Sequence, residues 1–593
     1  MKAFIYKTNQ YLLERFPTLW NTRLVWMLLI AFVLHLIFFV FGFFTLTNPE
    51  LLHEYSVKDI YFQNGTVFLN SIISILLLVL WLIYMFKNNA FKNYYPTTTS
   101  KLFGQFLCYL IIIFSCSAFF LSYNYGLKLY IATEYPDAQT NKNIEVTNDV
   151  AMFLTHDISD YTIDKRRYPK PFYTLYCEQY RTWKEDSLPK LEFLDQRYKF
   201  YTLKTKTLPK SERHREQDSS YLGFVFIRVT DSLRIYYYKD TIVDPSPFAK
   251  SAVPSLYNAS FTFFKSRHDK LDDDRGNYEY NQYSYLNVDY SYNSYRPDFT
   301  LRHQLRSERN NALLDRNDTS EIKGLLENFI TLSNRYKIEH NLTSEQWFNL
   351  IYQPDDFKVK HFIRPEPKDD YDYFDIENSE LTAIEKFQYE RLTDFYFNKD
   401  ELQNVFYNIE DIKASSPLFD SIHFFMWFSF VISCIIFMFR VTGLKALLFS
   451  IITVGILTLF ISLLTALIFY LIQGRNDEIG IYLILYFTLI LGTIILAIPT
   501  LFIKKIKKLV VAICVNISII GFPLYLFLII GIITMHQNDI CHADPNFYSR
   551  NYECHTLMDL FGVYWSYILF IIGILFLFFY SKVIKNWKSL PEG

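Results

Sequence analysis

Apolar residues gather in eight long runs, and polar segments separate these runs along the chain. No run carries a charged residue in its middle, and each is long enough to cross about 30 Å of hydrocarbon as a helix. The runs lie at 24–46, 67–86, 103–125, 421–439, 446–472, 479–503, 509–534 and 561–580. The pattern predicts an α-helical polytopic membrane protein with eight transmembrane helices, three before and five after one long polar insertion.

The first apolar run has two interpretations. A secretory signal has an apolar core of about 7–15 residues followed by a small-residue cleavage site, and this run is longer and has no such site after it. We therefore interpret it as a retained anchor. Residues 1–23 ahead of it place apolar side chains on one side of a helix, with Lys7 and Arg15 available to lipid headgroups. They predict a cytoplasmic interfacial helix, although an ordinary charged lead-in has the same composition.

Lysine and arginine in the short connections alternate from one side of the membrane to the other. One side holds 16 of them and the other holds 3. The 16 include Arg23, Lys87, Lys92, Lys101, Lys504, Lys505, Lys507, Lys508, Lys582 and Lys585. Because cytoplasmic loops are enriched in these residues, we expect both termini in the cytoplasm of a bacterial cell with the chain in its inner membrane. Residues 131–419 then lie outside the cytoplasm.

The polar insertion at 131–419 carries both strand and helix patterns. Residues 221–229 and 233–238 resemble two strands of a hairpin. Helical spacing begins near Ile322, where Thr319 or Ser320 can cap the helix, and a second helix can start at Thr343 or Ser344. Further helical patterns lie at 379–395 and 399–412. We therefore predict an inserted extracytoplasmic α+β domain. The expected division of the chain is 1–23, 24–130, 131–419 and 420–593.

Two features of this domain suggest binding but have simpler explanations. Tyrosines recur across 278–295, either as an aromatic platform for a ligand or as a sheet face packed under helices, and we favour the sheet face. Acidic clusters at 272–274 and 369–372 lack the full spacing of a calcium loop, so we interpret them as solvated loops.

Two cysteines lie together in the last outside loop. Cys541 and Cys554 would meet an oxidising compartment there, where cysteines form disulfides. Each precedes a histidine, His542 or His555, so a zinc site is the alternative. Adjacent Cys-His ligands are not the usual zinc spacing, and we favour the disulfide.

The chain carries no recognisable catalytic motif. It has no G-x-x-x-x-G-K-[S/T] loop, no G-x-S-x-G elbow and no H-E-x-x-H helix. The net charge of −1 offers no global field for nucleic acid. We expect no enzyme activity, no cofactor, no metal and no nucleic-acid partner.

Three residues are candidates for breaks in the transmembrane helices. Pro499 lies in the sixth apolar run, and Gly521 and Pro523 lie in the seventh. Proline bends a membrane helix unless its neighbours compensate, and such bends often accompany moving parts in transporters. Glycine and proline are also common in membrane helices generally, so gating and simple packing both stay open.

Taken together, these features suggest a permease that depends on a separate source of energy. The chain has an interfacial helix, a basic loop at 87–102 that a cytoplasmic ATPase subunit could hold, and a domain after its third span. In this arrangement it resembles ABC-type export permeases, some of which have an extracytoplasmic domain between their third and fourth spans. The resemblance is architectural and rests on no shared motif. It implies the membrane subunit of an ATP-driven exporter or envelope-remodelling complex, as a homodimer or a hetero-oligomer. The alternative is a receptor or scaffold whose outside domain binds an envelope component.

Overall fold

The chain separates into two compact units, each of which draws on distant parts of the sequence. The first unit contains residues 1–44, 61–127 and 415–593, and the second contains 45–60 and 128–414. A computed structural model describes residues 2–88, 90, 98–153, 175–180, 189, 191–193, 196–209, 224–229, 233–244, 263–264, 266, 309, 312–313, 316–351, 362–364, 367, 392–472, 477–543 and 555–588.

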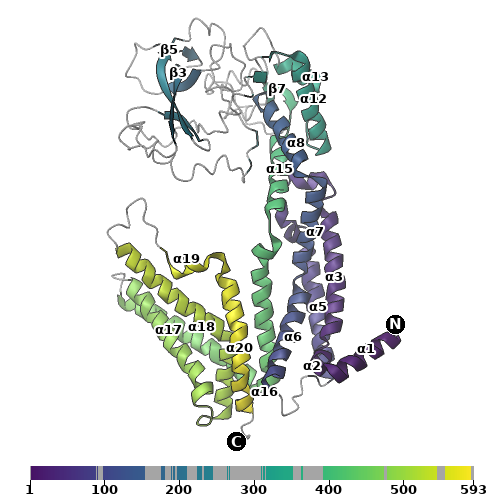
Figure 1. Ribbon diagram of the computed structural model, residues 1–593, viewed down its shortest axis with the longest axis vertical. Coiled ribbons are helices and arrows are strands. Elements are labelled where there is room, and N and C mark those ends of the chain that lie inside the picture. The colour runs from purple at the N-terminus through teal and green to yellow at the C-terminus, as the bar shows by residue number, and fades with distance from the viewer. Residues whose placement is uncertain are drawn as a thin grey trace, which may run out of the picture. The chain divides into compact units, whose positions relative to one another are not determined.

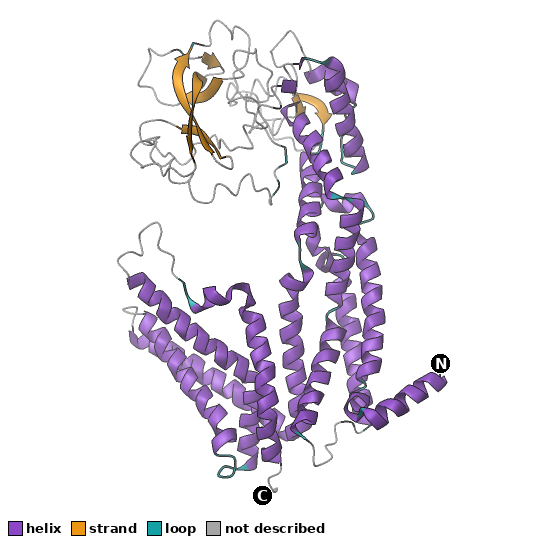
Figure 2. Cartoon of the chain, viewed as in Figure 1, coloured by secondary structure: helices purple, strands orange, loops and turns teal. Residues whose placement is uncertain are grey.

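The described part of the first unit is helical (Figures 1 and 2). Its helices are α1 (Lys2–Arg15), α2 (Pro17–Thr22), α3 (Leu24–Thr45), α4 (Ile60–Gln63), α5 (Thr66–Lys87), α6 (Thr99–Ser117), most of α7 (Phe119–Glu134), α16 (Pro417–Ile472), α17 (Asp477–Leu501), α18 (Lys508–Ala543), α19 (Leu557–Phe561), the 3₁₀ turn η8 (Gly562–Tyr564) and α20 (Trp565–Lys588). Within this unit α6 packs against α5, α16 and α20, and α18 packs against α16, α17 and α20.

Seven described helices are long and apolar enough to cross a membrane, namely α3, α5, α6, α16, α17, α18 and α20. Their side chains are largely exposed outside the helix contacts, as expected where lipid replaces water. The prediction of a helical membrane protein is therefore confirmed. The described part has seven such helices because the fourth and fifth apolar runs form the single element α16.

Helix α16 has an interruption at Gly443. A straight helix of its 56 residues would be about 84 Å long, far more than one membrane thickness. Gly443 has φ 85° and ψ 167°, a conformation that is essentially confined to glycine, and the residues on both sides are helical. The chain therefore changes direction at this residue, which the hydropathy pattern marked only as a short gap between two runs.

Helices α3 and α7 approach each other unusually closely within the first unit. A Cβ atom on Gly42 of α3 would lie 1.9 Å from the backbone oxygen of Tyr123. A Cβ on Gly126 of α7 would lie 2.0 Å from the backbone oxygen of Phe39. Each glycine thus allows the backbone of its own helix to contact the backbone of the other helix, which is the usual role of small residues between membrane helices.

The strands belong to the second unit, where five of them form one antiparallel sheet. They are β1 (Leu175–Tyr180), β2 (Leu191–Phe193), β3 (Gln196–Pro209), β4 (Phe224–Val229) and β5 (Leu233–Val243). The order is β1-β3-β5-β4, and β2 also pairs with β3. A short parallel pair is formed by β6 (Phe362–Arg364) and β7 (Leu392–Tyr396).

The hairpin expected near residue 230 is present as β4 and β5, with Val229 opposite Arg234. Strands β1 and β3 were not predicted, because alternating lysine, threonine and tyrosine in β3 give only a weak apolar signal. The helix expected at 379–395 is wrong at its end, since Leu392–Tyr396 pairs with β6 as a strand. Its earlier residues, the tyrosines of 278–295 and both acidic clusters lie outside the described residues.

The second unit also contains helices α8 (Asp137–Val150), α12 (Thr319–Arg335), α13 (Ser344–Ile351) and α15 (Lys399–Ala414), with the 3₁₀ turns η1 (Pro49–His53), η2 (Val57–Asp59) and η3 (Ala151–Phe153). Phe329 of α12 packs against Trp347 and Phe397, with ring centroids 5.4 and 4.9 Å apart. The predicted helices at 319 and 399 are therefore confirmed, and their apolar faces are buried.

The N-terminal caps of two of these helices can be compared with the sequence predictions. Thr343 caps α13 as expected, because its hydroxyl accepts from the amide of Gln346. The cap of α12 was assigned wrongly. Asp318, one residue earlier than expected, accepts from the amides of Ser320 and Glu321. Its carboxylate satisfies two free amides and carries the negative charge that the helix N-terminus favours.

Candidate functional site

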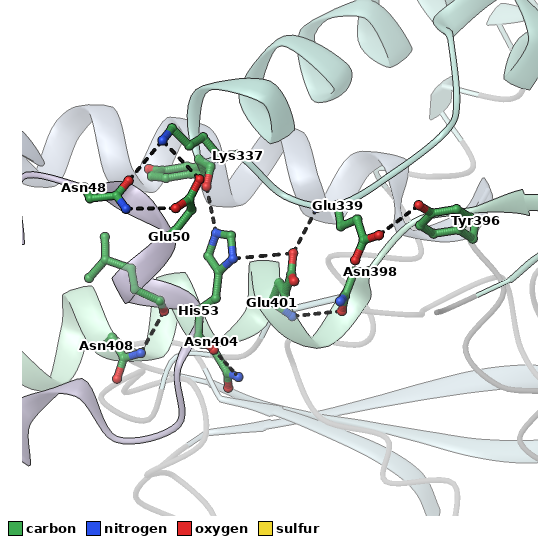
Figure 3. A network of polar contacts seen from close by, with 12 residues as sticks. Asn48, Glu50, His53, Lys337, Glu339, Tyr396, Asn398, Glu401, Asn404 and Asn408 are labelled. Carbon is green, nitrogen blue, oxygen red and sulfur yellow. Dashed lines mark hydrogen bonds and ion pairs between the residues drawn. The ribbon is translucent and has the colours of Figure 1, made fainter. Parts of the chain in front are cut away.

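A network of polar side chains ties the segment 45–60 to α15 and to residues 336–339, which follow α12, inside the second unit (Figure 3). Asn408 of α15 is its buried centre, with 3% of its surface exposed. Its amide nitrogen donates to the carbonyl oxygens of Leu52 and Glu54 at 2.9 and 2.8 Å, and its oxygen accepts from the amide of Val57 at 3.0 Å. One side chain thereby satisfies three backbone groups of a segment that has little regular structure of its own.

The imidazole of His53 lies between two acceptors in the same network. Its Nε2 is 2.7 Å from the carbonyl oxygen of Tyr336, and its Nδ1 is 3.5 Å from a carboxylate oxygen of Glu401. A neutral imidazole can donate through only one nitrogen. Through these two contacts His53 joins Tyr336, which follows α12, to Glu401 of α15.

Lys337 lies at the solvent-exposed edge of the network. Its ammonium group donates to Asn48 at 3.0 Å and to Glu50 at 3.1 Å (Figure 3). Hydrogen bonds from Asn48 and then Lys337 lower the pKa of the Glu50 carboxyl. The ion pair is therefore complete at neutral pH, and its contribution is lost as the pH falls through that lowered pKa.

The contacts of this network hold backbone segments together, and we call it the clamp. Tyr396 and Asn398, which complete it, bond to Glu339 and Glu401. Among the residues that the structure describes, no group of three or more metal-ligating side chains is present. The arrangement can hold the connection between α3 and α5 against the inserted segment, so that both behave as one body.

A second feature lies in the first unit, where a groove of about 620 Å³ opens between α16 and α20. Its lining comprises His423, Phe424, Trp427, Phe428, Val431, Trp565 and Ser566. Apolar and aromatic side chains make up most of this lining, and Phe424 is 67% exposed. The two helices are joined by a hydrogen bond of 2.9 Å from the Trp427 indole to the Ser566 hydroxyl.

Several polar groups inside the first unit are paired with neighbouring helices. Asn516 of α18 donates to Ser450 at 3.0 Å and accepts from Thr442 at 3.0 Å, close to Gly443. Arg440 donates to the buried Tyr109 hydroxyl at 2.6 Å. These contacts satisfy groups that would be costly to leave unpaired in hydrocarbon.

The sequence-predicted site residues do not converge on one place. Arg23 lies over the rings of Trp20 and Tyr84, at 4.3 and 5.2 Å from the centroids. Lys87 and Lys101 lie at the last turn of α5 and the first turn of α6, and Lys92 lies outside the described residues. Lys504, Lys505 and Lys507 lie between α17 and α18, Lys508 begins α18, and Lys582 and Lys585 lie near the end of α20.

The residues predicted to break helices lie inside continuous helices. Pro499 is near the end of α17, and α18 continues through Gly521 and Pro523. Pro523 packs closely on α20, because a Cβ on Gly573 would lie 2.9 Å from its ring. A gating role for these residues stays a prediction.

Cys541 lies near the end of α18, and Cys554 lies outside the described residues, so their pairing also stays a prediction. The sequence analysis did not single out His423, Trp427, Asn408 or Gly443. Glycine at the gap between two apolar runs was the only local signal for any of them.

No protein-family model matches this chain, and neither a curated protein nor a solved structure matches it.

Proposed function

We propose that this protein is the membrane subunit of an ATP-driven, ABC-type exporter or envelope-remodelling complex in a bacterial inner membrane. The observation that carries the proposal is the insertion of a second compact unit between the third and fourth long apolar runs. The clamp around Asn408 supports it, because it fastens the connection between α3 and α5 to that same unit. Movement of the membrane helices would then reach the second unit through both of its chain segments, 45–60 and 128–414.

In this proposal the chain crosses the membrane eight times. Helix α16 supplies two of these crossings, one before Gly443 and one after it. The conformation of Gly443 supports this count, as do Arg440 and Lys445, which flank it with the charge typical of a cytoplasmic turn. Both termini and α1 then lie on the cytoplasmic side. Residues 131–419 and the segment 45–60 lie outside the cytoplasm as an α+β domain.

The proposal predicts that a soluble ATPase binds the basic loop at 87–102. The full-length chain, tagged and solubilised in a mild detergent, should co-purify with such a protein. Replacing Lys87, Lys92 and Lys101 by glutamate should lower its yield by about tenfold, since opposite charge at an interface rim slows association and weakens binding. The yield is measured by quantitative mass spectrometry and by ATP hydrolysis.

Arg550→Glu is the matched control, because this residue is on the opposite side in the proposed topology. Equal yields from both variants, or no ATPase in any preparation, would contradict the exporter proposal. In that case the receptor or scaffold function becomes the better account. Binding of an envelope component without ATP would support that alternative.

The proposed sidedness also predicts that Cys541 and Cys554 form a disulfide, which would stabilise the closed loop by roughly 3 kcal/mol. In a Cys177→Ser background, a membrane-impermeant maleimide should label intact cells only after reduction. The four free cysteines that are described, Cys108, Cys116, Cys434 and Cys514, are all buried. Labelling without reduction would contradict the disulfide, and a failure to label from outside after reduction would contradict the sidedness. Cys541→Ser should expose the Cys554 thiol without reduction.

A further inference from the structure

The groove between α16 and α20 has the shape and lining of a site for an acyl chain. Its floor and walls are the rings of Trp427, Phe428 and Trp565 with the side chain of Val431. Val431 and Phe428 are 39% and 40% exposed on helices that are apolar enough to cross a membrane. In a bilayer the medium in contact with such a surface is hydrocarbon, so lipid chains reach the groove without crossing water.

The length of the groove matches one leaflet. Eight residues separate His423 from Val431 along α16, which corresponds to about 12 Å of helix. Half of the hydrocarbon core is about 15 Å thick. A single acyl chain that enters near His423 and ends near Val431 would therefore fill the groove within one half of the bilayer.

One end of the groove carries polar groups that a hydrocarbon chain alone would not use. His423 and Ser566 both line the groove at this end. The ring is held in place by Tyr567, at a centroid distance of 4.4 Å. The Ser566 hydroxyl accepts from Trp427 and keeps its own proton free to donate.

We propose that this groove binds one acyl chain of a membrane glycerophospholipid, with the ester or phosphate oxygens of that lipid at His423 and Ser566. The chain lies along Phe424, Trp427, Phe428 and Val431. In the sidedness proposed above, α16 begins at the outer surface, so the lipid belongs to the outer leaflet. The binding itself requires only insertion in the membrane and does not depend on an ATPase.

The test uses full-length protein in nanodiscs that contain a phosphatidylglycerol with a photoactivatable diazirine in its acyl chain. Cross-linked peptides are mapped and quantified by mass spectrometry. Adducts should concentrate on the α16 residues of the groove and on Trp565, well above those on the exposed faces of α5. Val431→Phe should lower the groove adducts by about tenfold, the change that 1.4 kcal/mol of lost binding free energy produces.

Val79→Phe is the matched control, because Val79 is similarly exposed, at 44%, on α5 and lies outside the groove. His423→Ala should retain the cross-link sites but lower the number of lipids that stay bound when the protein is moved into detergent, as native mass spectrometry counts them. Adducts spread evenly over α5 and α16 would show annular lipid only and would overturn the proposal. Displacement of the probe by an acylated peptide at lower concentration than by phosphatidylglycerol would overturn the assignment to a phospholipid.

Discussion

Replacing Gly126 by alanine is expected to destabilise the first unit by about 3 kcal/mol, at the upper end of the range for overpacked sites. The added Cβ would lie 2.0 Å from the backbone oxygen of Phe39 and 2.8 Å from the backbone nitrogen of Phe43. Backbone atoms cannot rotate away as a flexible side chain would, so α3 and α7 must move apart. Gly42→Ala should have a similar effect, because its Cβ would meet Tyr123 from the other helix. Thermal unfolding of the purified protein in detergent measures both variants.

Gly104→Ala on α6 provides the matched control for these substitutions. Nothing lies within 4 Å of the Cβ that it would add. Alanine is favoured over glycine inside a helix by about 1 kcal/mol, so this variant should be neutral or more stable. If Gly126→Ala unfolds at the same temperature as Gly104→Ala, the close crossing of α3 and α7 is refuted.

Replacing Asn408 by alanine is the second change with a large expected effect, a loss of about 3 kcal/mol in the second unit. The variant leaves the carbonyl oxygens of Leu52 and Glu54 and the amide of Val57 without their shared partner. Leu52 and Val57 are themselves fully buried, so water cannot fully replace the lost bonds. Hydrogen–deuterium exchange should become faster across 52–57, and the melting temperature should fall.

Two further variants separate the three bonds of Asn408. Asn408→Asp keeps the acceptor for Val57 but places a carboxylate against two carbonyl oxygens, so it should be no better than alanine. Asn404→Ala removes a single bond of 2.8 Å to the carbonyl oxygen of His53 and should cost about 1 kcal/mol. Equal and small losses for Asn404→Ala and Asn408→Ala would mean that the segment 45–60 is not held by this clamp.

The sequence was a good guide where a property depends on neighbours along the chain. A helix that crosses a bilayer must be apolar over its whole length, so α3, α5 and α17 begin and end within two residues of the runs read from hydropathy. Helices α12 and α15 were likewise predicted from their spacing of apolar residues. The cap at Asp318 was missed because Thr319 and Ser320 are equally acceptable cap residues when only local sequence is considered.

Tertiary structure decided the features that depend on pairs of distant residues. Gly42 and Gly126 are ordinary helix glycines until α3 and α7 cross, and Asn408 is an ordinary amide until it meets a segment about 350 residues earlier. The groove likewise exists only because Trp427 and Ser566 come together. The physical reason is that burial in lipid is set by composition along one helix, whereas close packing and hydrogen bonding are set by which helices meet. By itself, the sequence determined that this is a helical membrane protein, and the tertiary structure decided which helices cross closely and which distant residues are hydrogen-bonded.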